Sequence, residues 1–157
     1  MRKTLLTLFA LFLFANANCQ EEPNIEKEKK AIIAVIEGET NYFYNRDFKR
    51  FAACYVQDDT FIRLGKSGSS YNYIVGWDGF IDIFGNWFDN NSDLLENKEV
   101  KKNYKIKVYE DCAWVVFDQG NKSNGKFIRK NIGVNFLEKV NGEWKIVYLS
   151  RVESSTN

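Results

Sequence analysis

FIRKNIGVNFLEKVNGEWKIVYLSRV, residues 127–152, consists of two long strand-forming runs joined by Asn141-Gly142. An Asn-Gly pair between such runs is the strongest short signal for a β-hairpin, because both residues tolerate the positive φ angles of a tight turn. The stretch therefore predicts two antiparallel strands, over residues 127–140 and 143–152.

Further strands are predicted upstream of this hairpin. Residues 100–109 alternate apolar side chains with lysines, and residues 112–119 form a nearly continuous apolar run, so we expect both faces of the latter strand to be covered. Residues 60–64 and 71–75 are also rich in strand formers, and the Gly- and Ser-rich segment 65–70 separates them as a turn.

Helical periodicity marks three other segments. Apolar residues recur at three- and four-residue steps over residues 25–45, where Asn24 can cap the helix, and over the shorter segment 48–55. A third helix is predicted at about residues 79–89, with Asp78 as its cap. Each helix has one apolar face that needs a sheet to lie on. The pattern predicts an α+β domain whose curved sheet wraps three helices and leaves a cone with a cavity.

The N-terminal segment has the order of a secretory signal peptide. Basic residues 1–3 precede the apolar run 5–14, and the small residues 15–17 follow it. The apolar run is shorter than the roughly 20 residues that span a bilayer. We expect cleavage after Ala17 or near Cys19, which leaves residues 20–157 as one exported domain, periplasmic or secreted. A lipid anchor at Cys19 stays open as an alternative.

Composition excludes several function classes. The chain has no histidine, which excludes His-ligated metal sites and Ser-His-Asp catalysis. After removal of the leader, 20 basic side chains face 21 acidic ones, so no basic field attracts nucleic acid. No metal or cofactor is predicted. The sequence leaves open whether Cys54 and Cys112 pair or remain buried thiols.

Four segments resemble one superfamily in their order and spacing. They are Asn45–Phe51 (NRDFKRF), Cys54–Phe61 (CYVQDDTF), Gly76–Phe80 (GWDGF) and Phe136–Val147 with its hairpin turn. Together, across residues 26–152, they resemble the nuclear transport factor 2-like superfamily, which includes ketosteroid isomerase, scytalone dehydratase and the SnoaL-like proteins. The resemblance implies the cone-shaped α+β fold. It implies no single function, because this fold hosts enzymes, binders and adaptors.

The resemblance also implies where isomerase chemistry would reside. Its base position falls on Arg63, its tyrosine position near Glu39 and its second acid position near Gly133. An arginine cannot abstract a proton at neutral pH. Isomerase or dehydratase chemistry of that type is therefore not expected.

The same alignment predicts a ligand site with mixed polar and aromatic walls. Residues 129, 131, 133 and 135 share one face of their strand, and this face is expected to line the cavity. Several arginines beside aromatic walls suit a small anionic ligand such as a carboxylate. The candidate ligand-binding residues are Glu39, Tyr42, Arg63, Trp77, Asp118, Arg129, Asn131, Asn135 and Arg151.

Three alternatives stay open on the sequence alone. In the first, Arg63 forms a structural ion pair with Glu39 or Asp118, and no ligand is needed. In the second, Asp118, Glu39 or Tyr42 acts in acid-base catalysis of the SnoaL-like kind. In the third, the domain forms a homodimer through the outer face of the sheet. The residues expected on that outer face are Ile132, Val134 and Phe136, with Val147 or Ile146.

Overall fold

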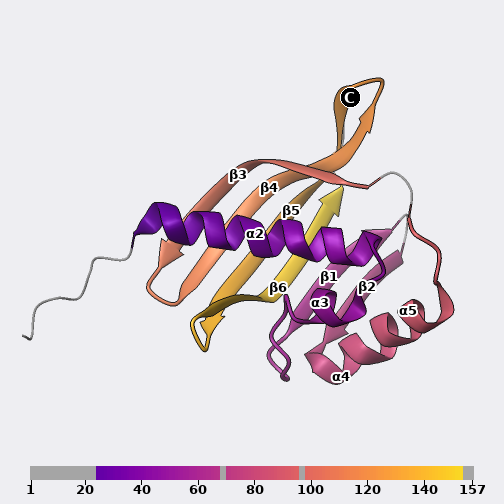
Figure 1. The fold of residues 1–157 in the computed structure, drawn as a ribbon, viewed down its shortest axis with the longest axis horizontal. Helices are drawn as coiled ribbons and strands as arrows, with labels where there is room; N and C mark the ends of the chain where they lie inside the picture. The colour runs from indigo at the N-terminus through magenta and orange to yellow at the C-terminus, as the bar shows by residue number, and fades with distance from the viewer. Residues whose placement is uncertain (1–23, 68–69, 96–97, 154–157) are drawn as a thin grey trace, which may run out of the picture.

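The computed structural model describes residues 24–67, 70–95 and 98–153, so the predicted signal segment lies outside the described residues. The described residues form one six-stranded sheet with helices on one side of it (Figure 1). Its strands are β1 (Ile62–Ser67), β2 (Ser70–Val75), β3 (Val100–Tyr109), β4 (Cys112–Ser123), β5 (Lys126–Val140) and β6 (Glu143–Glu153).

The predicted final hairpin is confirmed. Strands β5 and β6 pair in antiparallel register, with Val140 opposite Glu143. The two residues between them have positive φ angles, 53° at Asn141 and 82° at Gly142. Positive φ at both central residues is the geometry of the turn that matches the twist of paired strands.

The strand order across the sheet is β2-β1-β6-β5-β4-β3. Strand β1 runs parallel to β6, and the other neighbours pair in antiparallel register. This parallel pairing places the first strand beside the last one. Residues far apart in the sequence therefore meet in the middle of the sheet.

The helices are α2 (Ile25–Tyr44), α3 (Phe48–Ala52), α4 (Gly76–Phe80), the π-helical segment η1 (Ile81–Gly85) and α5 (Asn86–Asn90). The Asn24 side chain caps α2 by accepting a hydrogen bond from the Lys27 backbone N–H at 3.1 Å, as predicted. The predicted cap at Asp78 is wrong, because this helix begins earlier, at Gly76, and leaves Asp78 inside its first turn.

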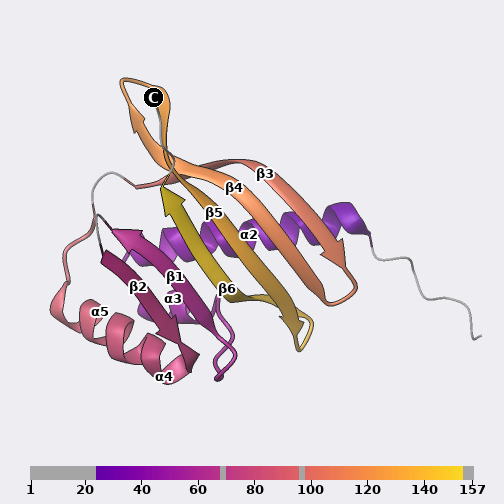
Figure 2. The same cartoon turned by 180° about the vertical axis from the view of Figure 1, so that it is seen from behind.

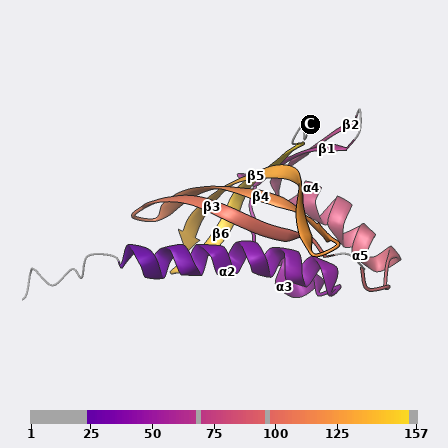
Figure 3. The same ribbon diagram turned by 90° about the horizontal axis from the view of Figure 1, so that it is seen from above.

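Helix α2 lies along one face of the curved sheet, and α4 and α5 lie beside β1 and β2 (Figures 1 and 3). Seen from the other side, the sheet has no described element in front of it (Figure 2). The buried core fills the space between α2 and the sheet, with Ile32 and Ile36 from the helix and Val115 and Leu149 from the sheet. The predicted cone-shaped α+β fold is confirmed.

A β-bulge in β3 changes which lysine faces the core. The register with β4 shifts between Lys102 and Lys105, and Asn103 has a φ of 56°. The extra residue reverses the alternation of side chains on the N-terminal side of the bulge. As a result Lys101 is buried, whereas Lys102 and Lys105 are exposed.

The two cysteines of the domain are unpaired. Cys54 is buried and Cys112 is exposed at the start of β4. The expectation of two buried thiols is therefore right for Cys54 and wrong for Cys112. Within the described part of the chain, no helix has the length and apolar character needed to cross a membrane.

Candidate functional site

An interior cavity of about 250 Å³ lies between the C-terminal half of α2 and the sheet. Its polar and aromatic walls come from α2, α3, η1, five strands and the segment that precedes β3. The residues that line it are Glu39, Thr40, Phe43, Tyr44, Phe51, Arg63, Gly65, Lys66, Asn72, Phe84, Glu99, Gln119, Asn131 and Arg151. Of the nine predicted ligand-binding residues, Glu39, Arg63, Asn131 and Arg151 line it.

Glu39 is the buried acid at the base of this cavity. Its carboxylate accepts a hydrogen bond from the Tyr55 hydroxyl at 2.8 Å and one from the Thr40 hydroxyl at 3.0 Å. The ammonium of Lys101 lies 3.3 Å from Glu39 Oε2, and Arg151 Nη2 lies 3.9 Å from the same oxygen. Glu39 is thus fully paired inside the protein.

The surroundings of Glu39 keep it ionised. Burial alone would raise the pKa of this carboxyl, but the positive charges of Lys101, Arg151 and Arg63 lower it to about 2. A general base works best when its pKa lies near the operating pH. Glu39 is therefore poorly suited to abstract a proton from a substrate, which argues against its predicted role in acid-base catalysis.

Lys101 is a site residue that sequence reasoning missed. Its ammonium is buried and donates hydrogen bonds to the backbone carbonyl of Ile36 at 2.6 Å, to the Thr40 hydroxyl and to Glu39. Burial lowers the pKa of Lys101, and the Glu39 carboxylate opposes this effect. The sequence signal that could have identified Lys101 as buried is Asn103, because asparagine tolerates positive φ and this residue interrupts the alternation of β3.

Arg63 lines the cavity, and no ion pair joins it to another described residue. Its guanidinium carbon lies 4.9 Å from the centre of the Phe84 ring, and its Nη1 is buried with no hydrogen-bond partner among the described residues. The alternative in which Arg63 pairs with Glu39 or Asp118 is therefore wrong. Glu39 takes Lys101 as its partner instead, since Lys101 reaches it from β3.

The polar face of β5 points into the domain, but of the described side chains on it only Asn131 lines the cavity, so the prediction that Asn135 lines it is wrong. Gly133 and Asn135 are buried, whereas Phe136 on the other face is 47% exposed. Asn135 Oδ1 accepts a hydrogen bond from Arg151 Nη1 at 3.4 Å. The side chain of Arg129 lies outside the described ones, and only its backbone position opposite Gly120 is known.

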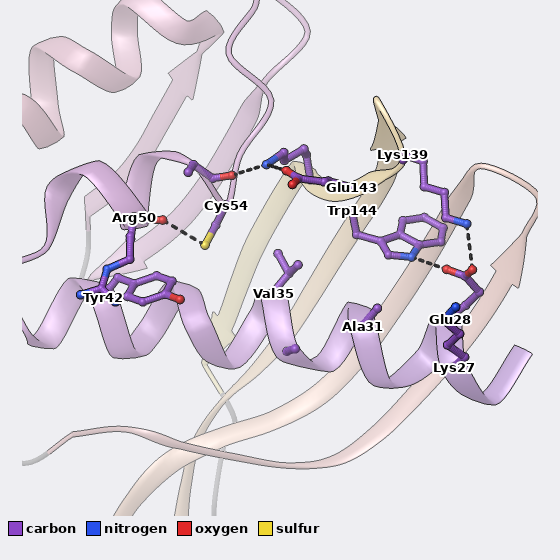
Figure 4. A pocket seen from close by; sticks show the side chains of 14 residues that line it. Lys27, Glu28, Ala31, Val35, Tyr42, Arg50, Cys54, Lys139, Glu143 and Trp144 are labelled. Carbon is purple, nitrogen blue, oxygen red and sulfur yellow. Dashed lines mark hydrogen bonds and ion pairs between the residues drawn. The ribbon is translucent and has the colours of Figure 1, made fainter.

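Tyr42 does not line the cavity, contrary to the prediction. Successive residues of an α-helix are rotated by about 100°, so Tyr42 and Phe43 point to different sides of α2. Phe43 faces the cavity, and Tyr42 lies in an outer groove between α2, α3 and the β5–β6 hairpin (Figure 4). In this groove, Lys139 and Trp144 both contact Glu28.

Two more predicted residues lie away from the cavity. Trp77 stacks on Phe80 with ring centres 4.7 Å apart, so it serves as a packing residue of α4. Asp118 lies between the inward-facing Phe117 and Gln119, and its carboxylate accepts a hydrogen bond from Asn103 Nδ2 at 2.7 Å. Because side chains alternate along a strand, Gln119 and not Asp118 enters the interior.

Residues 32–151 match the SnoaL-like domain family. The chain belongs to this family, and with it to the nuclear transport factor 2-like superfamily. None of the curated proteins compared with the chain matches it at a significant level.

Solved structures share the SnoaL-like fold at low sequence identity. A nuclear transport factor 2-like protein of unknown function from Shewanella oneidensis has 18% identity and a TM-score of 0.59, over 80% of this chain and 99% of that one. A protein described as a putative aromatic ring hydroxylase, from Novosphingobium aromaticivorans, has 15% identity and a TM-score of 0.61, over 86% and 94%. A protein described as a putative dehydratase, from Streptomyces avermitilis, has 9% identity and a TM-score of 0.63, over 83% and 99%. At such identities the similarity shows the fold alone.

Within this SnoaL-like domain, the three isomerase positions hold unsuitable groups. Arg63 is a permanent cation, Glu39 is held ionised by its partners, and Gly133 has no side chain. Among the described residues, no three acidic or cysteine side chains lie close enough to hold a metal ion. The groups that converge in the cavity are instead suited to hydrogen bonding and charge pairing with a ligand.

Proposed function

We propose that this SnoaL-like domain binds a small organic anion, such as a carboxylate, in the cavity beside Arg63. The observation that carries the proposal is the state of Arg63, a cation that lines the cavity and has no carboxylate within ion-pair distance among the described residues. Arg63 is half-buried, and its buried Nη1 costs free energy when it is left without a partner. A bound carboxylate would supply the missing charge and accept two parallel hydrogen bonds from the guanidinium.

The charge around the cavity supports an anionic ligand. Four cations lie in or directly behind its wall: Arg63, Lys66, Lys101 and Arg151. Two carboxylates oppose them, Glu39 and Glu99, and Glu39 is already paired. This arrangement leaves a surplus of positive charge at the cavity, which attracts an anion.

The aromatic walls and the volume set the size of the ligand. Phe43, Phe51 and Phe84 provide apolar surface next to Arg63. A cavity of about 250 Å³ equals the space of roughly eight water molecules. A single-ring acid such as phenylacetate matches this combination of size, apolar surface and charge.

We propose binding without turnover, although the SnoaL-like fold supports either a ligand-binding or an enzymatic domain. An acid-base mechanism needs a group that can exchange a proton near neutral pH. Glu39 is held ionised, and Tyr42 and Asp118 lie outside the cavity. Burial and the Glu39 charge raise the pKa of Tyr55 well above its ordinary value, so this residue stays a hydrogen-bond donor.

The test is calorimetric titration with phenylacetate and with its uncharged analogue phenylacetamide. The proposal expects phenylacetate to bind and phenylacetamide to bind at least about tenfold more weakly, because the amide lacks the charge that Arg63 takes. Arg63→Met should remove most of this preference. Arg50→Met is the matched control, since Arg50 is exposed and pairs with Asp47 outside the cavity. Equal binding of both probes, or binding of neither, would refute the proposal.

We also propose that the domain acts outside the cytoplasm, on the pattern of residues 1–19. The support is the basic, apolar and small-residue order of that segment. Mass spectrometry of the chain purified from its native cell tests it. A mature chain that starts after Ala17 or near Cys19 supports export, and a lipid mass on Cys19 supports the anchored alternative. A chain that retains Met1 and the leader would refute both.

A homodimer is a second candidate role, favoured by the uncovered face of the sheet (Figure 2). That face, called the outer face below, carries Ile132, Val134 and Phe136 on β5, Tyr148 and Val152 on β6, and Tyr73 on β2. Three of these side chains are strongly exposed: Phe136 at 47%, Val152 at 55% and Tyr73 at 64%.

A second copy of the chain is the occupant that this face fits best. An antiparallel sheet face in contact with water normally carries polar side chains, and a continuous apolar patch marks an interaction site. A two-fold axis lets the same patch cover itself, which is the commonest arrangement in homo-oligomers. The predicted contribution of Ile146 to this face is wrong, because Ile146 is fully buried in the core, and Val147 packs against the core at the β5–β6 bulge.

A further inference from the structure

A buried amide on β4 faces the cavity with an unused acceptor. Gln119 is 4% exposed and lines the cavity. Its Nε2 donates a hydrogen bond to a carboxylate oxygen of Glu99. A carboxylate can only accept, so this contact fixes which end of the amide is nitrogen. The Gln119 Oε1 is therefore an acceptor, and it has no partner among the described residues.

Two unused donors lie on other strands of the sheet, one on β5 and one on β1. Asn135 is 1% exposed, and its Oδ1 accepts a hydrogen bond from Arg151, which can only donate. The Asn135 Nδ2 is thereby identified as a donor, and it is buried without a partner, as is Arg63 Nη1. Each such group costs free energy when it is left unpaired. Of these residues, Arg63 and Gln119 line the cavity, so a ligand that pairs the Arg63 donor and the Gln119 acceptor at once would remove both of their costs.

We infer that the ligand is a small hydroxylated carboxylic acid with an apolar body, an inference that rests on the proposed anion site. Its carboxylate pairs with Arg63, and its hydroxyl donates a hydrogen bond to Gln119 Oε1. The apolar body lies against Phe43, Phe51 and Phe84. A hydroxyl suits the acceptor better than an ammonium does, because the cations around the cavity outnumber the carboxylates Glu39 and Glu99, and this surplus disfavours a second cation.

Three acids of nearly equal size provide the test. Phenylacetate has no donor beside its carboxylate, mandelate adds a hydroxyl at that carbon, and phenylglycine adds an ammonium. Calorimetric titration of the unmodified protein should show that one enantiomer of mandelate binds about tenfold more tightly than phenylacetate. Phenylglycine should bind more weakly than mandelate.

The outcomes separate this inference from the proposal on which it rests. If phenylacetate binds and neither enantiomer of mandelate binds more tightly, the hydroxyl assignment is wrong while the anion site stands. Tighter binding of phenylglycine than of mandelate would overturn the choice of a hydroxyl. If none of the three acids binds, the anion site itself is wrong.

The Gln119→Leu variant tests whether Gln119 accepts the hydrogen bond from the ligand hydroxyl. This variant keeps the shape of the side chain and removes Oε1. Mandelate and phenylacetate should then bind with about equal affinity. Gln57→Leu is the matched control, because Gln57 is exposed outside the cavity. A preference that persists in folded Gln119→Leu protein would overturn the assignment to Gln119. The comparison of acids on the unmodified protein remains decisive if this variant does not fold.

Discussion

Gly133 leaves the space that the Phe117 ring occupies. A Cβ atom at Gly133 would lie 2.4 Å from Cζ and 2.5 Å from Cε2 of Phe117, far inside van der Waals contact. The ring in turn packs against the charged groups of the site: the guanidinium carbon of Arg151 lies 5.5 Å from its centre and the ammonium of Lys101 lies 5.7 Å from it. Because Gly133 has no side chain, the Phe117 ring can lie beside Lys101 and Arg151, the two cations next to Glu39.

Gly133→Ala should destabilise the domain by about 1–3 kcal/mol, because the added methyl group must displace a fully buried aromatic ring. Urea unfolding followed by tryptophan fluorescence measures the change. Gly65→Ala is the matched control in β1, where a Cβ meets its nearest neighbour, Asn72, at an ordinary 4.0 Å. An equal loss of stability in both variants would show that a general cost of substituting strand glycines explains the effect.

The Glu39 carboxylate should make stability depend on pH in the acid range. Its pKa is about 2 in the folded chain against an ordinary value of 4.5, so the ionised group stabilises the native state fully above pH 4.5. This contribution, about 3 kcal/mol, is lost as the pH falls from 4.5 towards 2. The difference in unfolding free energy between the unmodified protein and Glu39→Gln should shrink over that interval. Glu110→Gln, an exposed control, should show no such change.

Glu39 and Lys101 should be coupled energetically. Removing one partner leaves the other as an unpaired buried charge, so Glu39→Gln and Lys101→Met should each cost about 3–5 kcal/mol. The double variant removes both charges and should lose less than the two single variants combined, by about 1–3 kcal/mol. Denaturant unfolding of the four proteins completes the cycle. Additive losses would contradict a direct interaction between the two groups.

The two cysteines of the domain should differ sharply in reactivity. Burial raises the pKa of Cys54 to about 12, and its side chain is 7% exposed, whereas Cys112 is exposed. In a Cys19→Ser background, a thiol reagent at pH 8 should modify Cys112 quickly and Cys54 only when the protein unfolds. Cys112→Ser should abolish the fast phase. Two fast phases in the folded protein would contradict the burial of Cys54.

A charge placed on the outer face should dissociate the proposed homodimer. Phe136→Lys puts an ammonium on the outer face beside Tyr148, where dimer formation would bury it without a partner. Light scattering coupled to size exclusion should then report a dimer for the unmodified chain and a monomer for the variant. Leu94→Lys makes the same change at a 70% exposed site elsewhere and should leave the mass unchanged. A monomeric unmodified chain would rule out this role.

Local chemistry in the sequence was enough to predict most of the elements. The Asn141-Gly142 turn, the helix that begins after Asn24 and the alternation along β5 all depend on residues near one another in the chain, and the structure has them as predicted. The inward direction of Arg63 and Arg151 follows from the same alternation. These features are governed by turn geometry, capping and the two-residue repeat of a strand.

Pairing between distant residues could be read only from the tertiary structure. The bulge at Asn103 buries Lys101 and so gives Glu39 a partner 62 residues away, and Tyr55 completes its hydrogen bonding. Arg63 consequently forms no ion pair with the other described residues. The sequence alone determined where most elements lie in the chain and which face most of their residues present. Only the tertiary structure decided which charged side chains contact each other. A bulge of one residue changes the side of the sheet to which the neighbouring side chains point, and only side chains on the buried side can then pair in the core.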